Sequence, residues 1–131
     1  MFNSAAILGV GTDLISQDRI GAVIQRHGER FPQRILASDE FAIYQTHSSP
    51  INYLTKAFAA KEALAKALGT GIALGVTFHD FSILRNANGA PEVVVRGRAK
   101  GLMDERSAHA KLLISLSDEG DWVQAFAVLS S

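Results

Sequence analysis

The feature that most constrains the fold is an alanine-rich stretch at residues 56–72, which reads KAFAAKEALAKALGTGI. Apolar side chains recur there at helical spacing, which predicts a helix over 51–68 that packs closely against its neighbours. Gly69 predicts the end of this helix, because glycine readily adopts the left-handed conformation of a C-cap. A closely packed helix rarely retains charge, yet Glu62 and Lys66 stand on one edge of this one. These two charges therefore need an explanation from the rest of the chain.

The segments on either side of this helix predict an α+β fold. Residues 6–15 are apolar with interspersed glycines, which predicts a buried strand that runs into a tight turn. Beyond the long helix the apolar period changes to two, as in strands. The other expected elements are a helix from Ser16 or Asp18 to Gly28, a helix from Ser38 to before Pro50, a hairpin of 76–84 and 91–97 with its turn at Asn86–Gly89, a helix over 98–108, and a hairpin of 111–118 and 122–130.

Composition narrows the class of protein. The 131 residues contain no repeat or linker, so we expect a single domain over 1–131 in which antiparallel hairpins pack on the long central helix. A net charge of zero argues against a protein that coats nucleic acid. No apolar run approaches the roughly 20 residues that span a bilayer. The absence of cysteine excludes thiolate chemistry and disulfides and suits a cytoplasmic protein.

A local basic face is nevertheless expected near the N-terminus. Residues 18–34 contain two acidic side chains and four arginines, so positive charge exceeds negative charge in this segment. Such a face favours an acidic protein partner, although scattered surface charge is more often simply solvated. The arginines of this cluster are Arg19, Arg26, Arg30 and Arg34.

The glycines before Asp13 allow two interpretations. The stretch GVGTDL follows a predicted strand, as a dinucleotide-binding loop would, but the third glycine of that fingerprint is missing. A bare carboxylate at Asp13 would also repel a phosphate, unless a cation lay between them. The alternative is a structural glycine turn in which Asp13 caps a neighbouring group. The residues themselves leave both interpretations open.

Glu62 and Lys66 allow two interpretations as well. Because they stand four residues apart, they could form a surface ion pair worth a few tenths of a kcal/mol. Alternatively, the closely packed helix holds a carboxylate whose desolvation only a cation offsets. The spacing alone does not choose between a surface pair and a cation site.

Four stretches of the chain together resemble a known family, the bacterial holo-[acyl-carrier-protein] synthases. In order, they are GVGTDLI, FAAKEALAKALGTGI, FSILRNANGAPEVVVRG and LLISLSDEGDWVQAFAVL, and they cover essentially the whole chain. This family is the small trimeric class of 4′-phosphopantetheinyl transferase. The resemblance implies a Mg²⁺-dependent enzyme of fatty acid biosynthesis that transfers the phosphopantetheine arm of coenzyme A to a serine of apo acyl carrier protein. The other product would be adenosine 3′,5′-bisphosphate.

The resemblance also implies roles for individual residues and an assembly. It implies a homotrimer with active sites at subunit interfaces, and no nucleic-acid or membrane partner. Lys66 would contact the phosphates of coenzyme A as well as take part in catalysis. The implied set is Asp13 and Glu62 as metal ligands, Asp13, Glu62 and Lys66 as catalytic residues, Phe58, Lys66, Gly69, Thr70 and Gly71 as coenzyme A contacts, and Arg19, Arg26 and Arg30 as carrier-protein contacts.

Two positions depart from the family pattern. Many members have an arginine where this chain has Ala57, and a histidine where it has Leu113. Both departures concern coenzyme A contact and leave the implied metal ligands intact; another basic group such as Lys56 could supply the missing charge. They keep open a carrier-protein-binding module with weakened or lost catalysis. A generic nucleotide-binding domain is a third possibility.

Overall fold

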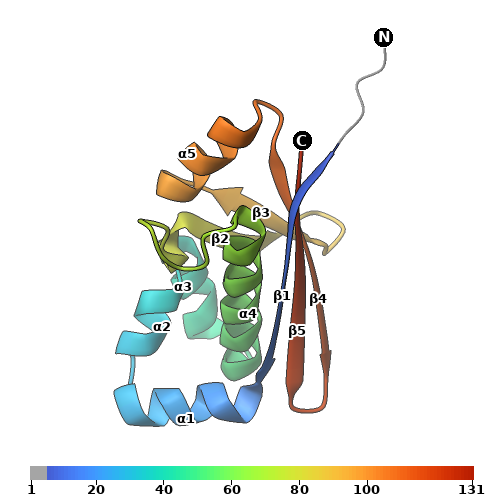
Figure 1. Cartoon of the computed structure of the whole chain (residues 1–131). Coiled ribbons are helices and arrows are strands. Elements are labelled where there is room, and N and C mark those ends of the chain that lie inside the picture. Colours follow the sequence, from blue (N-terminus) through green and yellow to red (C-terminus); the bar gives the residue numbers. More distant parts are fainter. Residues whose placement is uncertain (1–5) are drawn as a thin grey trace.

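The structure is a computed structural model that describes residues 6–131. The long helix α4 lies at its centre, with one three-stranded sheet along one side and shorter helices along the others (Figure 1). This arrangement confirms the α+β fold with a long central helix. The elements are β1 (Ile7–Ser16), α1 (Gln17–His27), α2 (Arg30–Ile35), α3 (Ser38–Thr46), α4 (Pro50–Leu68), η1 (Phe78–Asp80), β2 (Phe81–Arg85), β3 (Pro91–Val95), α5 (Gly97–Arg106), β4 (Lys111–Glu119) and β5 (Trp122–Ser130).

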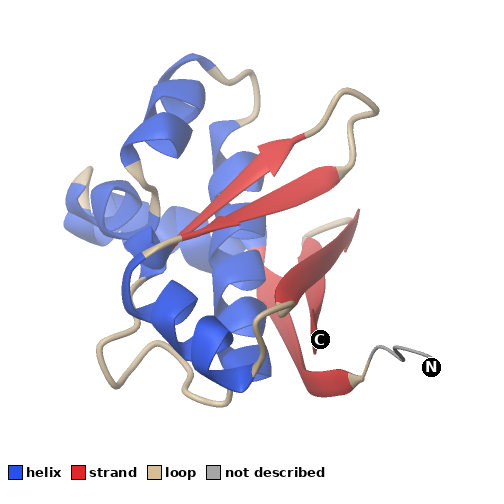
Figure 2. Ribbon diagram, turned by 90° about the horizontal axis from the view of Figure 1, so that it is seen from above, coloured by secondary structure: helices blue, strands red, loops and turns tan. Residues whose placement is uncertain are grey.

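Both predicted hairpins form, and they lie in separate antiparallel sheets. In the larger sheet β5 is central, with β1 on one side and β4 on the other. The strands β2 and β3 pair with each other in a second sheet. Figure 2 shows the two groups of strands apart from each other, with helices covering the remaining side of the molecule. The larger sheet packs one face against α4, so the strands position their inward side chains against that helix.

The glycines of β1 lie inside the strand, so the tight turn expected after residue 15 was wrong. A Cβ on Gly9 would lie 2.0 Å from the Ala67 carbonyl oxygen, and one on Gly11 would lie 2.0 Å from that of Ala63. Only glycine therefore allows the backbone of β1 to rest directly on α4. Because alternate residues of a strand face the same side, Asp13 is the next residue to face α4.

Three helix ends follow the predicted capping. Ser16 is the N-cap of α1, and its hydroxyl accepts a hydrogen bond from the Arg19 amide at 3.2 Å. Gly28 closes the same helix, and Gly69 closes α4 in the left-handed conformation with φ of 86°. The strand that carries Asp13 therefore leads without a loop into the helix that carries Arg19.

Two segments differ from the prediction. Residues 30–35 form a helix, α2, which is too short for its periodicity to be recognised. Residues 76–80 are not a strand, and only 81–85 pair in the hairpin. The carboxylate of Asp80 accepts hydrogen bonds from the Thr77 hydroxyl and from an amide in the first turn of α5, which folds this segment into the short helix η1.

Helix α4 is buried over most of its length, and its apolar side chains form the centre of the core. The core also encloses a charged pair, Lys61 and Glu40, both with 0% of the side chain exposed. Within residues 6–131, no helix is long and apolar enough to cross a membrane.

Candidate functional site

Asp13, Glu62 and Lys66 come together where β1 crosses α4. The Lys66 ammonium lies 3.4 Å from Asp13 Oδ1 and donates a hydrogen bond to the Thr12 carbonyl at 2.9 Å. In the part of the chain that the structure describes, Glu62 forms no ion pair. The simple helix-surface pair between Glu62 and Lys66 is therefore not formed, and the lysine bridges to the strand instead.

The two carboxylates repel each other. The pKa of Glu62 is raised above its ordinary value, first by burial, then by the negative charge of Asp13, while Lys66 partly opposes the shift. A raised pKa means that the ionised carboxylate is unfavourable in this environment. A cation placed between the two acids would remove this cost.

The second oxygen of Asp13 provides independent support for a cation. Asp13 Oδ2 is buried, and it has no hydrogen-bond partner among residues 6–131. Buried carboxylate oxygens are normally satisfied, so an orphaned one indicates a ligand. Mg²⁺ is commonly held by one or two carboxylates, with substrate phosphates and waters completing its shell. The donor set of Asp13 and Glu62 fits this ion, and the described residues contain no cluster of three or more ligands that would favour a closed protein site.

Glu62 also borders a cavity of about 270 Å³. Phe58, one turn before Glu62 on α4, stacks on Phe78 with ring centroids 5.6 Å apart. Arg34 was predicted only as part of the basic face, but it lines this cavity from α2. Nothing in the sequence placed α2 against α4, so this neighbourhood was missed. The residues that line the cavity are Phe31, Arg34, Ile35, Phe58, Glu62, Ile72 and Phe78.

Gly69, Thr70 and Gly71 form the turn that ends α4. The amides of Thr70 and Gly71 donate to the Ala65 carbonyl at 3.3 and 3.0 Å, and the Thr70 hydroxyl donates to the Gly71 carbonyl at 2.8 Å. These bonds keep the turn compact just beyond Lys66. Without side chains at two of its three positions, the turn allows a ligand to approach its backbone.

The predicted basic face is accessible. Arg19 and Arg26 are exposed on α1, and Arg30 is exposed at the start of α2. None of the three pairs with an acid within the described 6–131 range. Because β1 runs directly into α1, this cationic surface begins a short distance along the chain from Asp13.

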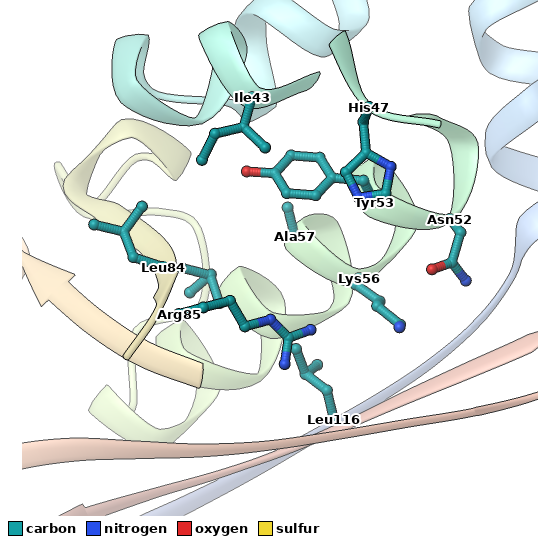
Figure 3. A pocket seen from close by; sticks show the side chains of 10 residues that line it. Ile43, His47, Asn52, Tyr53, Lys56, Ala57, Leu84, Arg85 and Leu116 are labelled. Carbon is teal, nitrogen blue, oxygen red and sulfur yellow. The ribbon is translucent and has the colours of Figure 1, made fainter. Parts of the chain in front are cut away.

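A larger cavity of about 540 Å³ lies between α3, α4, β2 and β4 (Figure 3). Its walls are mostly apolar, and Ala57 forms part of them. Lys56 and Arg85 contribute positive charge, and the rings of His47 and Tyr53 lie 5.1 Å apart. The buried Tyr53 hydroxyl finds no hydrogen-bond partner in the described chain. This cavity does not share a lining residue with the Glu62 cavity.

The outward face of the larger sheet is apolar. Val10, Leu14 and Phe126 are exposed on the side of the sheet that faces away from α4, and Phe126 lies opposite Thr12 and Ser115 in the strand register. Contiguous exposed apolar side chains on a sheet are unusual for a monomer and indicate an interface. The large exposed members of this face are Val10, Leu14, Leu113, Trp122 and Phe126.

Comparison with known proteins gives one consistent family. Residues 9–127 match the 4′-phosphopantetheinyl transferase superfamily. The holo-[acyl-carrier-protein] synthase of Aliivibrio fischeri is 44% identical over 126 residues, which cover 96% of this chain and 99% of that protein. The crystal structure of the same enzyme from Neisseria meningitidis matches with a TM-score of 0.87 and 41% identity, over 95% of this chain and 98% of that one. The Bacillus anthracis enzyme, solved in complex with coenzyme A (3′,5′-ADP), matches with a TM-score of 0.78 and 29% identity, over 95% and 97% of the two chains.

Proposed function

The chain belongs to the holo-[acyl-carrier-protein] synthases of the 4′-phosphopantetheinyl transferase superfamily, and we propose that Asp13, Glu62 and Lys66 form its catalytic centre. The enzyme transfers the 4′-phosphopantetheine group from coenzyme A to a serine of apo acyl carrier protein. We place this reaction in fatty acid biosynthesis in the cytoplasm. The observation that carries the assignment of the centre is the pair of carboxylates, one of which has a buried oxygen without a hydrogen-bond partner in the described part of the chain.

Each residue of the centre has a task that its chemistry supports. Asp13 and Glu62 would hold Mg²⁺, which supplies charge stabilisation on the pyrophosphate when it is bound. Lys66 already lies beside Asp13, so its ammonium is positioned to contact a phosphate of coenzyme A. The glycine turn after Lys66 leaves room for the nucleotide to approach. Phe58 would contact the substrate within the Glu62 cavity.

The direct test is a transfer assay. The protein would be incubated with apo acyl carrier protein, coenzyme A and Mg²⁺, and the carrier protein weighed by mass spectrometry. We expect the mass of one phosphopantetheine arm to be added, and the addition to stop when EDTA removes the metal. A carrier protein that is bound but never modified, while a known synthase modifies it in parallel, would support the binding-module alternative instead.

We propose that the basic face docks the carrier protein. Arg19, Arg26 and Arg30 are exposed and unpaired within the described region, so they present charge to an acidic partner. Replacing all three by alanine is expected to slow association about tenfold at low salt, because electrostatic steering is lost. Stopped-flow binding at increasing salt would measure this, with Arg98→Ala on α5 as the control. A wild-type rate that is insensitive to salt would rule out docking by this face.

A homotrimer would explain both the apolar sheet face and the second cavity. In a trimer the exposed side chains of β1, β4 and β5 would be buried against other copies of the chain. We propose that the cavity beside Ala57 then receives the nucleotide end of a coenzyme A held at another subunit's catalytic centre. The rings of His47 and Tyr53 could stack on the adenine base, and the cationic side chains of Lys56 and Arg85 could pair with phosphates. Lys56 and Arg85 would thus compensate for the arginine that is absent at position 57.

Phe126→Glu tests the trimer and the shared site together. A carboxylate at the centre of the apolar face is expected to prevent assembly, because burying an unpaired charge is unfavourable. Light scattering should give a trimer for the wild type and a monomer for the variant. Because each monomer then lacks the second cavity of a neighbour, isothermal titration should show coenzyme A affinity falling about 100-fold. A wild type that is monomeric and still binds coenzyme A tightly would contradict the shared site.

A further inference from the structure

We infer that Lys61 is a positioning residue of the transferase centre, which holds the end of α2 in place as one wall of the Glu62 cavity. Lys61 directly precedes Glu62 on α4, but its side chain leaves the helix towards the interior and is fully buried. The kinetic part of this inference rests on the proposed function. Its structural part rests on the contacts of Lys61 alone.

The pair that Lys61 forms with Glu40 connects four elements. The Lys61 ammonium donates to the Ile35 carbonyl at 2.6 Å, and Ile35 is both the last residue of α2 and part of the cavity wall. It also pairs with Glu40 Oε1 at 2.5 Å, in the first turn of α3. The two oxygens of Glu40 in turn accept from the Ala37 amide at 3.0 Å and from the Ile83 amide of β2 at 2.8 Å. The buried pair of Lys61 and Glu40 therefore connects α4 with the end of α2, with the start of α3 and with β2.

Helix α2 depends on such contacts because it cannot be stable alone. It has six residues, and isolated helices of this length do not persist in water. At the end of α2 that Lys61 contacts, the side chain of Ile35 is buried in the core. Two further contacts lie nearer the middle and start of α2: the His79 ring hydrogen-bonds the Gln33 carbonyl at 2.7 Å, and the ring of Phe31 lies 6.0 Å from that of Phe58. Lys61 supplies the hydrogen bond at the end of α2, where Arg34 and Ile35 line the cavity.

A role in stability alone does not account for this pair. Buried ion pairs are often no better for stability than apolar side chains of the same volume. Burial is also the largest influence on the pKa of Lys61, which it lowers, while Glu40 opposes the shift. An apolar side chain at 61, however, would leave the Ile35 carbonyl without its donor and could not define the end of α2. We therefore explain the buried pair by its effect on position: it fixes the end of α2 against α4.

The test compares Lys61→Met with the double variant Lys61→Met/Glu40→Gln. The single variant leaves Glu40 buried without a cation, so we expect it to be the more destabilised of the two. In the double variant the glutamine still offers an oxygen to one of the Glu40 donors, so we expect a folded protein by circular dichroism. Lys61→Arg keeps a cation with several donors and should restore much of the lost function. Lys100→Met, which removes an exposed pair with Asp104 at 3.0 Å, is the control.

We expect the double variant to lose carrier-protein turnover selectively. Because Arg30 and Arg34 move with α2, kcat/KM for the carrier protein should fall about 100-fold. The dissociation constant for coenzyme A should change less than about tenfold, because Phe58 is the one implied coenzyme A contact that lines this cavity, and Lys66 and the glycine turn lie outside it. Hydrogen exchange should accelerate in α2 and at Leu36, whose amide donates to the Pro32 carbonyl at 2.8 Å, but not in α4. The Lys100→Met control should change neither measurement.

Two outcomes would overturn the inference. If kcat/KM for the carrier protein and the affinity for coenzyme A fell by the same factor, in proportion to the unfolded fraction, Lys61 would only stabilise the fold. Unchanged exchange in α2 would mean that this helix does not depend on Lys61. Exchange is measured without substrates, so it decides the structural inference even if the wild type modifies no carrier protein and the proposed function fails.

Discussion

Replacing Glu62 by glutamine should lower kcat/KM for phosphopantetheine transfer by about 100-fold or more, because a neutral amide binds Mg²⁺ far less well than a carboxylate. The side chain keeps its size, and its burial beside Asp13 becomes less unfavourable, so the fold should be retained or slightly stabilised. Turnover would be followed by mass spectrometry over a Mg²⁺ titration. The variant should require a higher Mg²⁺ concentration for half-maximal activity.

Glu105→Gln is the matched control for this experiment. Glu105 is exposed on α5 and lies 3.9 Å from Arg98, so the same chemical change there should leave turnover and Mg²⁺ dependence unaltered. Carrier-protein binding by Glu62→Gln should also persist, since the basic face is untouched. If Glu62→Gln turned over at the wild-type rate with the same Mg²⁺ dependence, Glu62 would not be a metal ligand.

Gly11→Ala is expected to destabilise the protein by about 3 kcal/mol, near the upper end for overpacking a core. The added Cβ would lie 2.0 Å from the Ala63 carbonyl oxygen and 2.8 Å from the Ala67 nitrogen. Backbone atoms on α4 cannot rotate away, so β1 must move outwards and take Asp13 with it. Urea denaturation monitored by Trp122 fluorescence would measure the stability, and the transfer assay would measure the loss of activity in the fraction that remains folded.

Gly21→Ala provides the comparison, because it makes the same change in open space. A Cβ at Gly21, within α1, would meet no atom of residues 6–131 within 4 Å, and alanine is the better helix former. This variant should therefore be as stable as the wild type or more stable by at most about 1 kcal/mol. Equal effects of Gly11→Ala and Gly21→Ala would show that β1 and α4 are not in backbone contact.

The sequence was most informative where its patterns were long. The periodicity of α4 and the Gly69 cap predicted that helix and its end, and alternation predicted the two hairpins. The glycines of β1 were misjudged, since a pattern of glycines does not distinguish a turn from a close approach between backbones. That distinction depends on Ala63 and Ala67, which are remote in sequence.

The candidate site was only partly predictable for the same reason. Asp13, Glu62 and Lys66 were named from motifs, but the pairing of Lys66 with Asp13 needs the crossing of β1 over α4. Arg34 was missed as a cavity residue because α2 is too short to be predicted. Glu40 was likewise not expected to pair with Lys61, since nothing in either local sequence marks a buried partner.

The separation of the two cavities has a genetic consequence. Suppose that the cavity that borders Ala57 serves a neighbouring subunit. A chain with both carboxylates intact but a damaged cavity would then lower the turnover of its neighbour's catalytic centre, while its own centre stayed active. The converse defect, at Glu62, would impair only the chain that carries it. Two inactive alleles of opposite kind could therefore restore activity when expressed together, whereas two alleles of the same kind could not.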